Sequence, residues 1–500
     1  MSNKSEKGIT RKQFLKGMAA GVAGLTAASI APKANAGLFG GSKKEKWDEE
    51  LDTIIIGSGF AGLTAAIFSK ENGGNPVVLE KRSLIGGNSV LSTAWLNAAE
   101  TSIQREKFGI TNDTHELHYQ DTLKGGDYKN DPVLVRELTD KVTESVEWLK
   151  GLGAPFSKIT MLGGASRKRA HAPSDEYGGG LVKLLYSRAK ALDVEFRKKT
   201  KVIDFVVSQD EKTGMRTLDG VVVEDGEGTK RLKAKKAVII AAGGFGANAE
   251  LVKRYDPSLV GYETTNFKDA STGEVMISAM ENGVDTSGIN YIQIHPTFSN
   301  TPGKNNILIT EGLRGEGFIL VNTNGERFVQ DLDRRDVVSA AILAQPGKYA
   351  YLIGSKETYH PKVEAYKKSG LVFEGETLKE VAEKAGLDPV VLAATLKEYN
   401  GYVKAGKDPV YARKNLERPL LTGPFYVIRV KPAIHHTMGG VRINTKGQVI
   451  DLDGNVIKGM YAAGECTGGI HGTNRLGGNA VGDCVTFGRI AAQNAAKEQA

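Results

Sequence analysis

Short apolar runs that end in glycine-rich turns recur along this chain. In the first of them, residues 52–56 form an apolar run, GSGFAG follows directly, and residues 63–72 have a helical composition. A second apolar run at residues 77–79 then ends in Glu80. Short apolar runs bounded by glycine are typical of strands buried in a parallel sheet. The pattern therefore predicts a strand, a tight turn, a helix and a second strand.

The glycine spacing in that turn predicts a dinucleotide site. Gly57 permits the tight turn, Gly59 lets the backbone approach a pyrophosphate, and Gly62 allows the helix to pack closely on the strand. The helix N-terminus would stabilise the phosphate charge. Glu80 follows Gly62 by 18 residues, an interval that suits a hydrogen bond to a ribose hydroxyl. In this context the motif favours a dinucleotide site over an ordinary glycine-rich turn.

A helical pattern also covers residues 378–406, LKEVAEKAGLDPVVLAATLKEYNGYVKAG. Its glycine, aspartate and proline signals predict two helices joined at residues 386–389. The segment carries no obvious catalytic group, so we expect it to be structural.

The N-terminus has the pattern of an export signal. A basic region, TRKQFLKG, precedes a stretch of small apolar residues that ends in an A-x-A-like site at Ala34–Ala36. We expect residues 1–36 to be a signal peptide and residues 37–50 a polar linker. The basic region resembles a twin-arginine signal in which Lys12 stands at the second arginine. An uncleaved membrane anchor is the alternative, which the short apolar stretch disfavours.

Composition and charge describe an ordinary globular protein. The 500 residues are 40% hydrophobic and 25% charged, enough for more than one domain. The net charge of +8 includes +5 from residues 1–36, which hold six basic residues and one acidic residue, so the mature chain carries +3. That small excess gives no case for nucleic-acid binding. No other run approaches the roughly 18 apolar residues that span a bilayer, so we expect the mature form not to cross a membrane.

Cysteine content limits the redox chemistry that the chain can carry. Only Cys466 and Cys484 occur, and there is no C-x-x-C-H motif. The chain therefore lacks the ligands of an iron–sulfur cluster or a covalent haem, and we expect no metal site. The two cysteines could form a disulfide or remain as buried thiols.

Candidate chemistry is concentrated between His295 and Arg335. This segment holds a histidine, a hydroxyl, a carboxylate and several arginines, and further candidates stand beside glycine-rich segments at His435 and Arg475. Arginine binds carboxylates through paired charge-assisted hydrogen bonds, so the set suits a small dicarboxylate. Ordinary roles remain open for single residues, for example an i, i+3 ion pair between Glu311 and Arg314.

Three further motifs, EKRSLIGGNS, VIIAAGGFG and MYAAGE, resemble in their spacing the segments that line an extended FAD in one flavoprotein superfamily. Together with the histidines and arginines, they resemble the flavin part of periplasmic fumarate reductases of the flavocytochrome c type. These belong to the fumarate reductase and succinate dehydrogenase flavoprotein superfamily. The resemblance covers nearly everything after Asp52. It implies an α/β fold, with a Rossmann-like FAD-binding domain at 51–290 and 436–500 interrupted by an α+β capping domain at 291–435.

The resemblance also implies residue roles. Expected flavin contacts are Gly57, Gly59, Gly62, Glu80, Gly87, Asn88, Gly464, Glu465 and Gly478. Covalent attachment is not expected, because GGNSVLSTAW lacks the histidine that succinate dehydrogenase relatives use.

In the family, fumarate receives hydride from flavin N5 on one carbon and a proton on the other. The substrate carboxylates would be held by His295, Thr310, His435 and Arg475. Arg335 would be the proton donor, reprotonated through Glu311 and Arg314. From its chemistry alone, an arginine with a pKa above about 12 would be a carboxylate clamp and nothing more.

Departures from the family pattern leave other functions open. Leu162 and Leu308 stand in place of two methionines, and Trp95 in place of a glycine. We expect a periplasmic fumarate reductase that takes electrons from a separate c-type cytochrome or quinol-linked donor. The alternatives are a reductase of another 2-enoate, such as methacrylate or acrylate, and a non-catalytic flavin electron shuttle.

Overall fold

The computed structural model describes residues 46–173 and 177–498. The expected signal peptide and residues 37–45 of the expected linker lie outside these ranges. Residues from Trp47 onward form one compact unit. Among the described helices, none combines the length and apolar character that a membrane span requires.

The first sheet is built from the apolar runs that the sequence singled out. Its order is β17-β18-β8-β9-β1-β2-β6, with β7 beside β8. The bounds are β1 Glu49–Ile56, β2 Pro76–Glu80, β6 Glu195–Lys198, β7 Lys201–Gln209, β8 Arg216–Asp225, β9 Gly228–Ile240, β17 Gln448–Ile450 and β18 Val456–Ala462. Strands β6, β2, β1, β9 and β18 pair in parallel along this order. Because both faces of the central strands are covered, their side chains are apolar without alternation.

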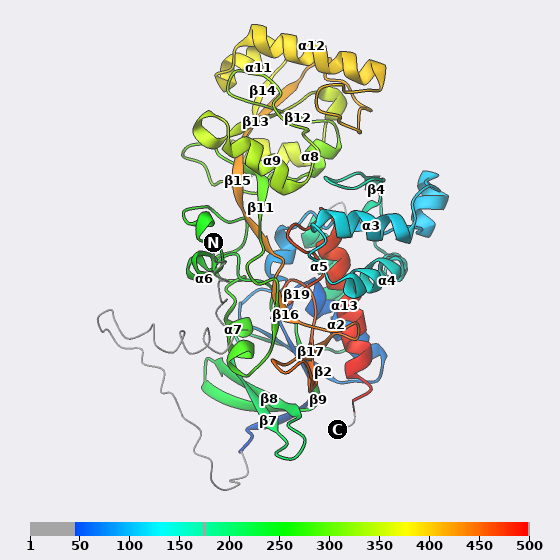
Figure 1. Ribbon diagram of the computed structural model, residues 1–500, viewed down its shortest axis with the longest axis vertical. Helices are drawn as coiled ribbons and strands as arrows, with labels where there is room; N and C mark the ends of the chain where they lie inside the picture. The colour runs from blue at the N-terminus through cyan, green and yellow to red at the C-terminus, as the bar shows by residue number, and fades with distance from the viewer. Residues whose placement is uncertain (1–45, 174–176, 499–500) are drawn as a thin grey trace, which may run out of the picture. The chain divides into compact units, whose positions relative to one another are not determined.

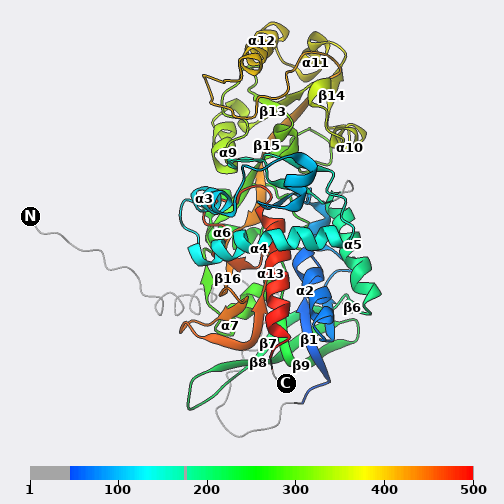
Figure 2. The same ribbon diagram turned by 90° about the vertical axis from the view of Figure 1, so that its right-hand side faces the viewer.

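The predicted strand–turn–helix–strand unit is confirmed as β1, α2 (Phe60–Glu71) and β2. The helix begins three residues before the stretch of helical composition, because Gly59 serves as its N-cap. Helix α2 packs beside α13 (Asn479–Ala495) against the sheet (Figure 2). This is the Rossmann-like α/β arrangement that the family resemblance implied.

A second sheet is antiparallel, in the order β11-β15-β13-β12, with β14 on β15. The bounds are β11 Ile292–Ser299, β12 Ile319–Val321, β13 Ala350–Gly354, β14 Phe373–Gly375 and β15 Phe425–Thr437. Alternate residues point to opposite faces. Leu352 and Ile428 join one apolar cluster with α9 (Arg335–Leu343) and α10 (Lys362–Lys368). Ile353 and Val427 join another with α11 (Leu378–Ala385) and α12 (Pro389–Ala405), the two helices predicted from the sequence (Figure 1).

Strands β11 and β15 carry candidate residues between these regions. Gln293 pairs with His436 and Ile294 with Ile434, so His435 is the extra residue of a β-bulge. A bulge re-aims the side chain that it inserts. The predicted boundary between residues 435 and 436 falls inside β15, and the division into domains stays a prediction.

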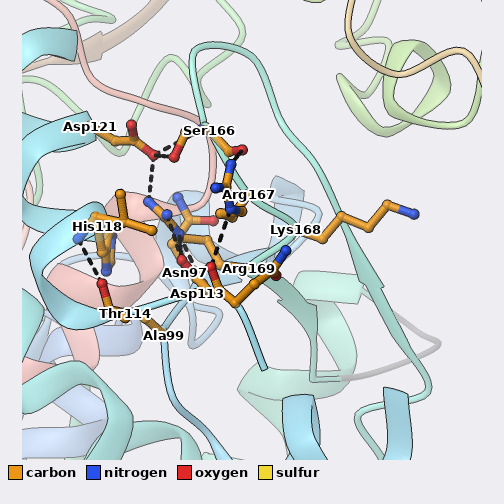
Figure 3. Close-up of polar contacts among 12 residues, drawn as sticks. Asn97, Ala99, Asp113, Thr114, His118, Asp121, Ser166, Arg167, Lys168 and Arg169 are labelled. Atoms are coloured by element: carbon orange, nitrogen blue, oxygen red, sulfur yellow. Dashed lines mark hydrogen bonds and ion pairs between the residues drawn. The ribbon is translucent and has the colours of Figure 1, made fainter. Parts of the chain in front are cut away.

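Helix α3 (His115–Gly125) lies beside α4 (Pro132–Gly151) and near the small sheet of β3 (Leu96–Asn97), β4 (Lys158–Thr160) and β5 (Ala170–Ala172). Arg169, only 1% exposed, donates hydrogen bonds to Asp113 and Asp121 (Figure 3). Asp121 belongs to α3, so the buried ion cluster fixes this helix to the segment before β5.

The remaining α-helices are α5 Tyr177–Ala191, α6 Ala249–Tyr255, α7 Glu274–Glu281 and α8 Gly312–Gly315. The other short strands are β10 Thr286–Ser287, β16 Gly440–Arg442 and β19 Thr467–Gly468.

Candidate active site

A cavity opens at the turn between β1 and α2. Six of the nine predicted flavin contacts line it, namely Gly57, Gly59, Glu80, Gly87, Asn88 and Glu465. The cavity also extends to Cys484 and to residues 241–243, which follow β9. The glycine turn and the distant MYAAGE motif therefore face one space.

Close approach explains the glycines that shape this space. Gly57 has φ +101°, and a Cβ there would lie 2.4 Å from the Ala241 carbonyl oxygen. A Cβ on Gly62 would lie 2.0 Å from the Gly57 oxygen, so this glycine permits the helix to pack on the turn. Gly464 and Gly478, both with positive φ, do not line the cavity and instead pack against Ala61 and Asn97.

Glu80 ends β2 with its carboxylate at the cavity. It accepts hydrogen bonds from Ser58 Oγ at 2.5 Å and from the Arg82 amide at 2.8 Å. The N-cap of α2 is a glycine and provides no side-chain cap. The Phe60 amide donates to Ser89 Oγ at 3.0 Å, and the helix N-terminus beside it faces the cavity and suits a phosphate. Asn88 bonds Asn266 and Ser271 across the same opening. Shape, helix end and carboxylate together fit a dinucleotide such as FAD.

The two cysteines are free thiols, not a disulfide. Burial raises the pKa of Cys466 to about 12 and that of Cys484 well above its usual value. Both are therefore protonated and unreactive at neutral pH.

A second constellation centres on the carboxylate of Glu311. Its Oε2 accepts from Arg335 Nε at 2.7 Å and lies 2.6 Å from Arg335 Nη2. Its Oε1 accepts from the backbone amide of Gly163 at 2.6 Å. Burial would raise the pKa of Glu311, but Arg335, Arg314 and the Gly163 amide reverse the effect and lower it. Glu311 is therefore ionised at neutral pH.

Arg314 and His295 flank the same oxygen. Arg314 Nη2 and His295 Nε2 each lie 3.9 Å from Glu311 Oε2. Burial lowers the pKa of Arg314 to about 10 and, with repulsion from Arg335, holds the pKa of His295 well below its usual value. His295 Nδ1 accepts the Thr297 amide at 3.2 Å, so we assign the proton of the neutral ring to Nε2.

Arg475 and His435 come from the other side of the site. Arg475 is 4% exposed, and in the described part of the chain its guanidinium has one long hydrogen bond, 3.4 Å to the Leu476 oxygen. Burial, followed by repulsion from Arg335, lowers the pKa of Arg475 to about 9. His435 shares a 2.7 Å hydrogen bond with Thr265 and is held neutral by burial and by Arg335 and Arg475.

The rings of His295 and His435 are in contact, with centroids 5.0 Å apart. Thr310 precedes Glu311, and its hydroxyl accepts the Gly312 amide at 3.1 Å. The residues predicted from distant parts of the sequence thus lie around one point. Leu162 packs on Trp95 in a small buried cluster beside it.

Three residues of this network were missed by sequence reasoning. Gln293 accepts from Arg335 Nη1 at 3.0 Å and donates to the Arg475 backbone oxygen at 2.8 Å, which links the two arginines. Gly163 and Thr265 bind Glu311 and His435. Only Gln293 had a signal, since it lies two residues before His295 on one strand and shares its face.

Comparisons with known proteins agree with this geometry. A family described as an FAD binding domain matches residues 52–481. A fumarate reductase (cytochrome) from Shewanella frigidimarina is 42% identical over 454 residues, which cover 90% of this chain and 77% of the relative. The chain belongs to the fumarate reductase and succinate dehydrogenase flavoprotein superfamily. This flavoprotein is therefore an FAD-dependent oxidoreductase of the class that acts on CH–CH groups.

A solved structure supports the fold of the flavoprotein. The open conformation of a flavocytochrome c3 fumarate reductase matches with a TM-score of 0.72 and 35% identity, over 99% of this chain and 82% of that one. The predicted fold class is confirmed. An acrylate reductase flavoprotein subunit from Shewanella woodyi is 31% identical over 99% of both chains.

Proposed function

We propose that the flavoprotein reduces fumarate to succinate, with electrons from a separate donor such as a c-type cytochrome or a quinol-linked protein. Bound FAD, held without a covalent bond, supplies the hydride. The similarity to the fumarate reductase of Shewanella frigidimarina supports this substrate. The charge of the site supports it independently.

The observation that carries the proposal is that Arg475, a buried cation, forms no ion pair with any of the described residues. Arg475 is almost fully buried and poorly hydrogen-bonded, while Glu311 is already bound to Arg335. A buried charge of this kind is costly unless a partner neutralises it. A substrate carboxylate against Arg475 and His435 supplies that partner, and the N–H of His295 with the Thr310 hydroxyl suits the second carboxylate.

The contacts of Arg335 support a role as the acid. Both of its contacts with Glu311 leave the guanidinium fixed in one orientation. After Arg335 gives a proton to the substrate carbon, Glu311 can return one, drawn from Arg314. Burial makes proton release from Arg314 easier than in water. Arg475 meanwhile stabilises negative charge that develops on the carboxylate in the transition state.

The test is an anaerobic assay of the purified holoprotein with an artificial one-electron donor and a panel of unsaturated acids. We expect fumarate to be the best substrate. Arg335→Ala should lower turnover at least about a hundredfold, the range for loss of a general acid, while the FAD content stays the same. An unchanged rate in this variant would support a flavin shuttle without a catalytic acid.

A second candidate is the reduction of another 2-enoate such as acrylate or methacrylate. The apolar wall of Trp95 and Leu162 beside the site favours it, as does the acrylate reductase relative. Turnover of either acid well above that of fumarate would establish this function in place of the first.

We also propose the organisation predicted from the sequence. An FAD-binding domain at 51–290 and 436–500 would be interrupted by a capping domain at 291–435, after a cleaved signal at 1–36. Export to the periplasm by the twin-arginine route would allow FAD to be loaded before transport. Sequencing the N-terminus of the periplasmic protein should give Gly37 as its first residue.

A further inference from the structure

Asp127 is a carboxylate with two unusual properties. It lies just after α3 and has φ 55°, as does Tyr128. Left-handed backbone at consecutive non-glycine residues is uncommon and persists only where the surrounding contacts hold it. The contacts here are ionic, because Asp127 Oδ1 and Oδ2 bind Arg334 Nη1 and Nη2 at 2.6 and 2.9 Å. The Thr473 hydroxyl donates to the same carboxylate.

Each partner of Asp127 is next to a proposed substrate-handling arginine. Arg334 is the N-cap of α9, whose first residue is Arg335. Thr473 stands two residues before Arg475, and its amide donates to the Gly126 oxygen at 3.1 Å. One carboxylate thus contacts both of the segments that present these arginines.

A second, buried path joins the same two segments. Gln293 accepts from Arg335 and donates to the backbone oxygen of Arg475 and to Asn474 Oδ1. The side-chain amide of Asn474 in turn donates to the Gly125 backbone oxygen, at the end of α3, at 3.0 Å. The relative position of the arginines is therefore fixed by a buried amide on one side and by Asp127 on the other.

Helix α3 is a firm base for this second contact. Asp121, one turn earlier, accepts from Arg169 Nη1 at 2.7 Å and from Ser166 Oγ at 2.7 Å (Figure 3). Arg169 is buried and also binds Asp113. Because these contacts hold α3 in place, they also hold the turn that follows it, which contains Asp127.

We propose that Asp127 is a positioning residue that sets Arg335 against Arg475 at the spacing a small unsaturated carboxylate requires. This inference rests on the proposed function, because it assigns Asp127 a role in the reaction of those two arginines. An alternative is that Asp127 forms an ordinary surface ion pair, which would contribute little.

The chain supplies a matched control for the ionic contact. Arg334 Nη2 also binds Asp336 at 2.6 Å, and the Asp127 and Asp336 side chains are 47% and 46% exposed. Asp336 lies within α9 itself, so its pair cannot link Arg335 to Arg475. Asparagine is the right replacement at both positions, because it tolerates the left-handed backbone of residue 127.

The experiment measures kcat and KM for the preferred acid in holoprotein carrying Asp127→Asn or Asp336→Asn. Misplacing a catalytic group lowers the reaction rate far more than losing a surface ion pair does. We therefore expect kcat/KM to fall about tenfold or more in D127N, and by less than about twofold in D336N. Melting temperature and FAD content should match between the two variants. Equal kinetic effects would overturn the proposal, and so would an unchanged D127N.

Two further measurements separate this proposal from the proposed function. Arg334→Gln should cost at least as much as D127N, because it also removes the bonds of Arg334 to Asp336 and to the Lys124 oxygen. The double variant should cost less than the sum of the two single variants, because both remove the Asp127–Arg334 pair. Amide hydrogen exchange does not depend on turnover: D127N should speed exchange around Thr473 and at the start of α9, whereas D336N should leave the Thr473 segment unchanged. If no acid is reduced, the proposed function fails, while the exchange result still decides whether Asp127 holds both segments. Unchanged exchange at Thr473 in D127N would refute the link.

Discussion

Replacing Arg475 by methionine should raise the free energy of unfolding and should abolish the stabilisation that a bound dicarboxylate provides. Burial, followed by repulsion from Arg335, lowers the pKa of Arg475 from its ordinary value to about 9. One pKa unit corresponds to about 1.4 kcal/mol, so keeping this guanidinium charged in the folded state costs on the order of 5 kcal/mol. At pH 7 Arg475 is protonated in both the folded and unfolded states, so the full cost is present. This cost would be relieved only as the pH rises from about 9 towards the ordinary pKa of an arginine in the unfolded chain.

Methionine has no charge and a similar length, so Arg475→Met should raise the free energy of unfolding by up to about 5 kcal/mol, less whatever packing is lost. The contrast is Arg169→Met. Arg169 is equally buried but fully paired with Asp113 and Asp121, and its removal would leave buried carboxylates without a cation. Breaking such a pair typically costs about 3–5 kcal/mol, so the two substitutions should have opposite signs.

Thermal and urea unfolding of the holoproteins, with FAD content measured in each, would test both expectations. Succinate at about one hundred times its Kd should stabilise the wild type by roughly 2.7 kcal/mol. It should not stabilise Arg475→Met, which lacks the cation for the carboxylate. The reasoning would be refuted if Arg475→Met were destabilised like Arg169→Met, or if succinate still raised its melting temperature.

Three other substitutions test separate parts of the structure. In Gly163→Ala, a Cβ would lie 2.8 Å from Glu311 Oε1. The hydrogen bond from the backbone amide of residue 163 to Glu311 should therefore be lost, and the pKa of Glu311, which this bond helps to lower, should rise. The acid limb of the kcat–pH profile would then move to higher pH, whereas Gly151→Ala, with nothing within 4 Å, would leave it in place. Trp95→Gly should lower kcat/KM for methacrylate relative to fumarate by about tenfold or more, because it removes part of the apolar wall that favours the less polar acid, and contacts of this kind discriminate on this scale. An unchanged ratio would show that Trp95 does not contact the substrate. Gly57→Ala should abolish the flavin absorbance of the purified protein, because φ +101° and the adjacent carbonyl exclude a side chain.

Most of the fold could be predicted from local sequence patterns. The strand–turn–helix–strand unit at Gly57 and the helix pair around Gly386 depend on residues close in sequence, and the structure contains both. Resemblance to a family brought Arg335, Glu311 and Arg475 into one site before any coordinates were known. Their roles in the reaction stay predictions.

What sequence reasoning missed are contacts between distant segments that use common residue types. The Gly163 amide bonds Glu311 across 148 residues, and Asp127 bonds Arg334 across 207. Neither residue stands in a recognisable motif. A backbone amide or a single aspartate leaves no sequence pattern that distinguishes one role from another. The bulge at His435 was equally hidden, since register is a property of two paired strands.

The electrostatics of the site explain how an arginine could serve as its acid. Burial and the neighbouring cations keep His295 and His435 neutral, and Glu311 is ionised, so none of these three carries an easily released proton. Protons are instead held on Arg335 and Arg314. In water a guanidinium is too weak an acid, but burial lowers the pKa of Arg314 to about 10, which reduces the cost of proton transfer along the chain. A histidine in the place of Arg335 would be neutral for the same physical reasons, and would have no extra proton to give.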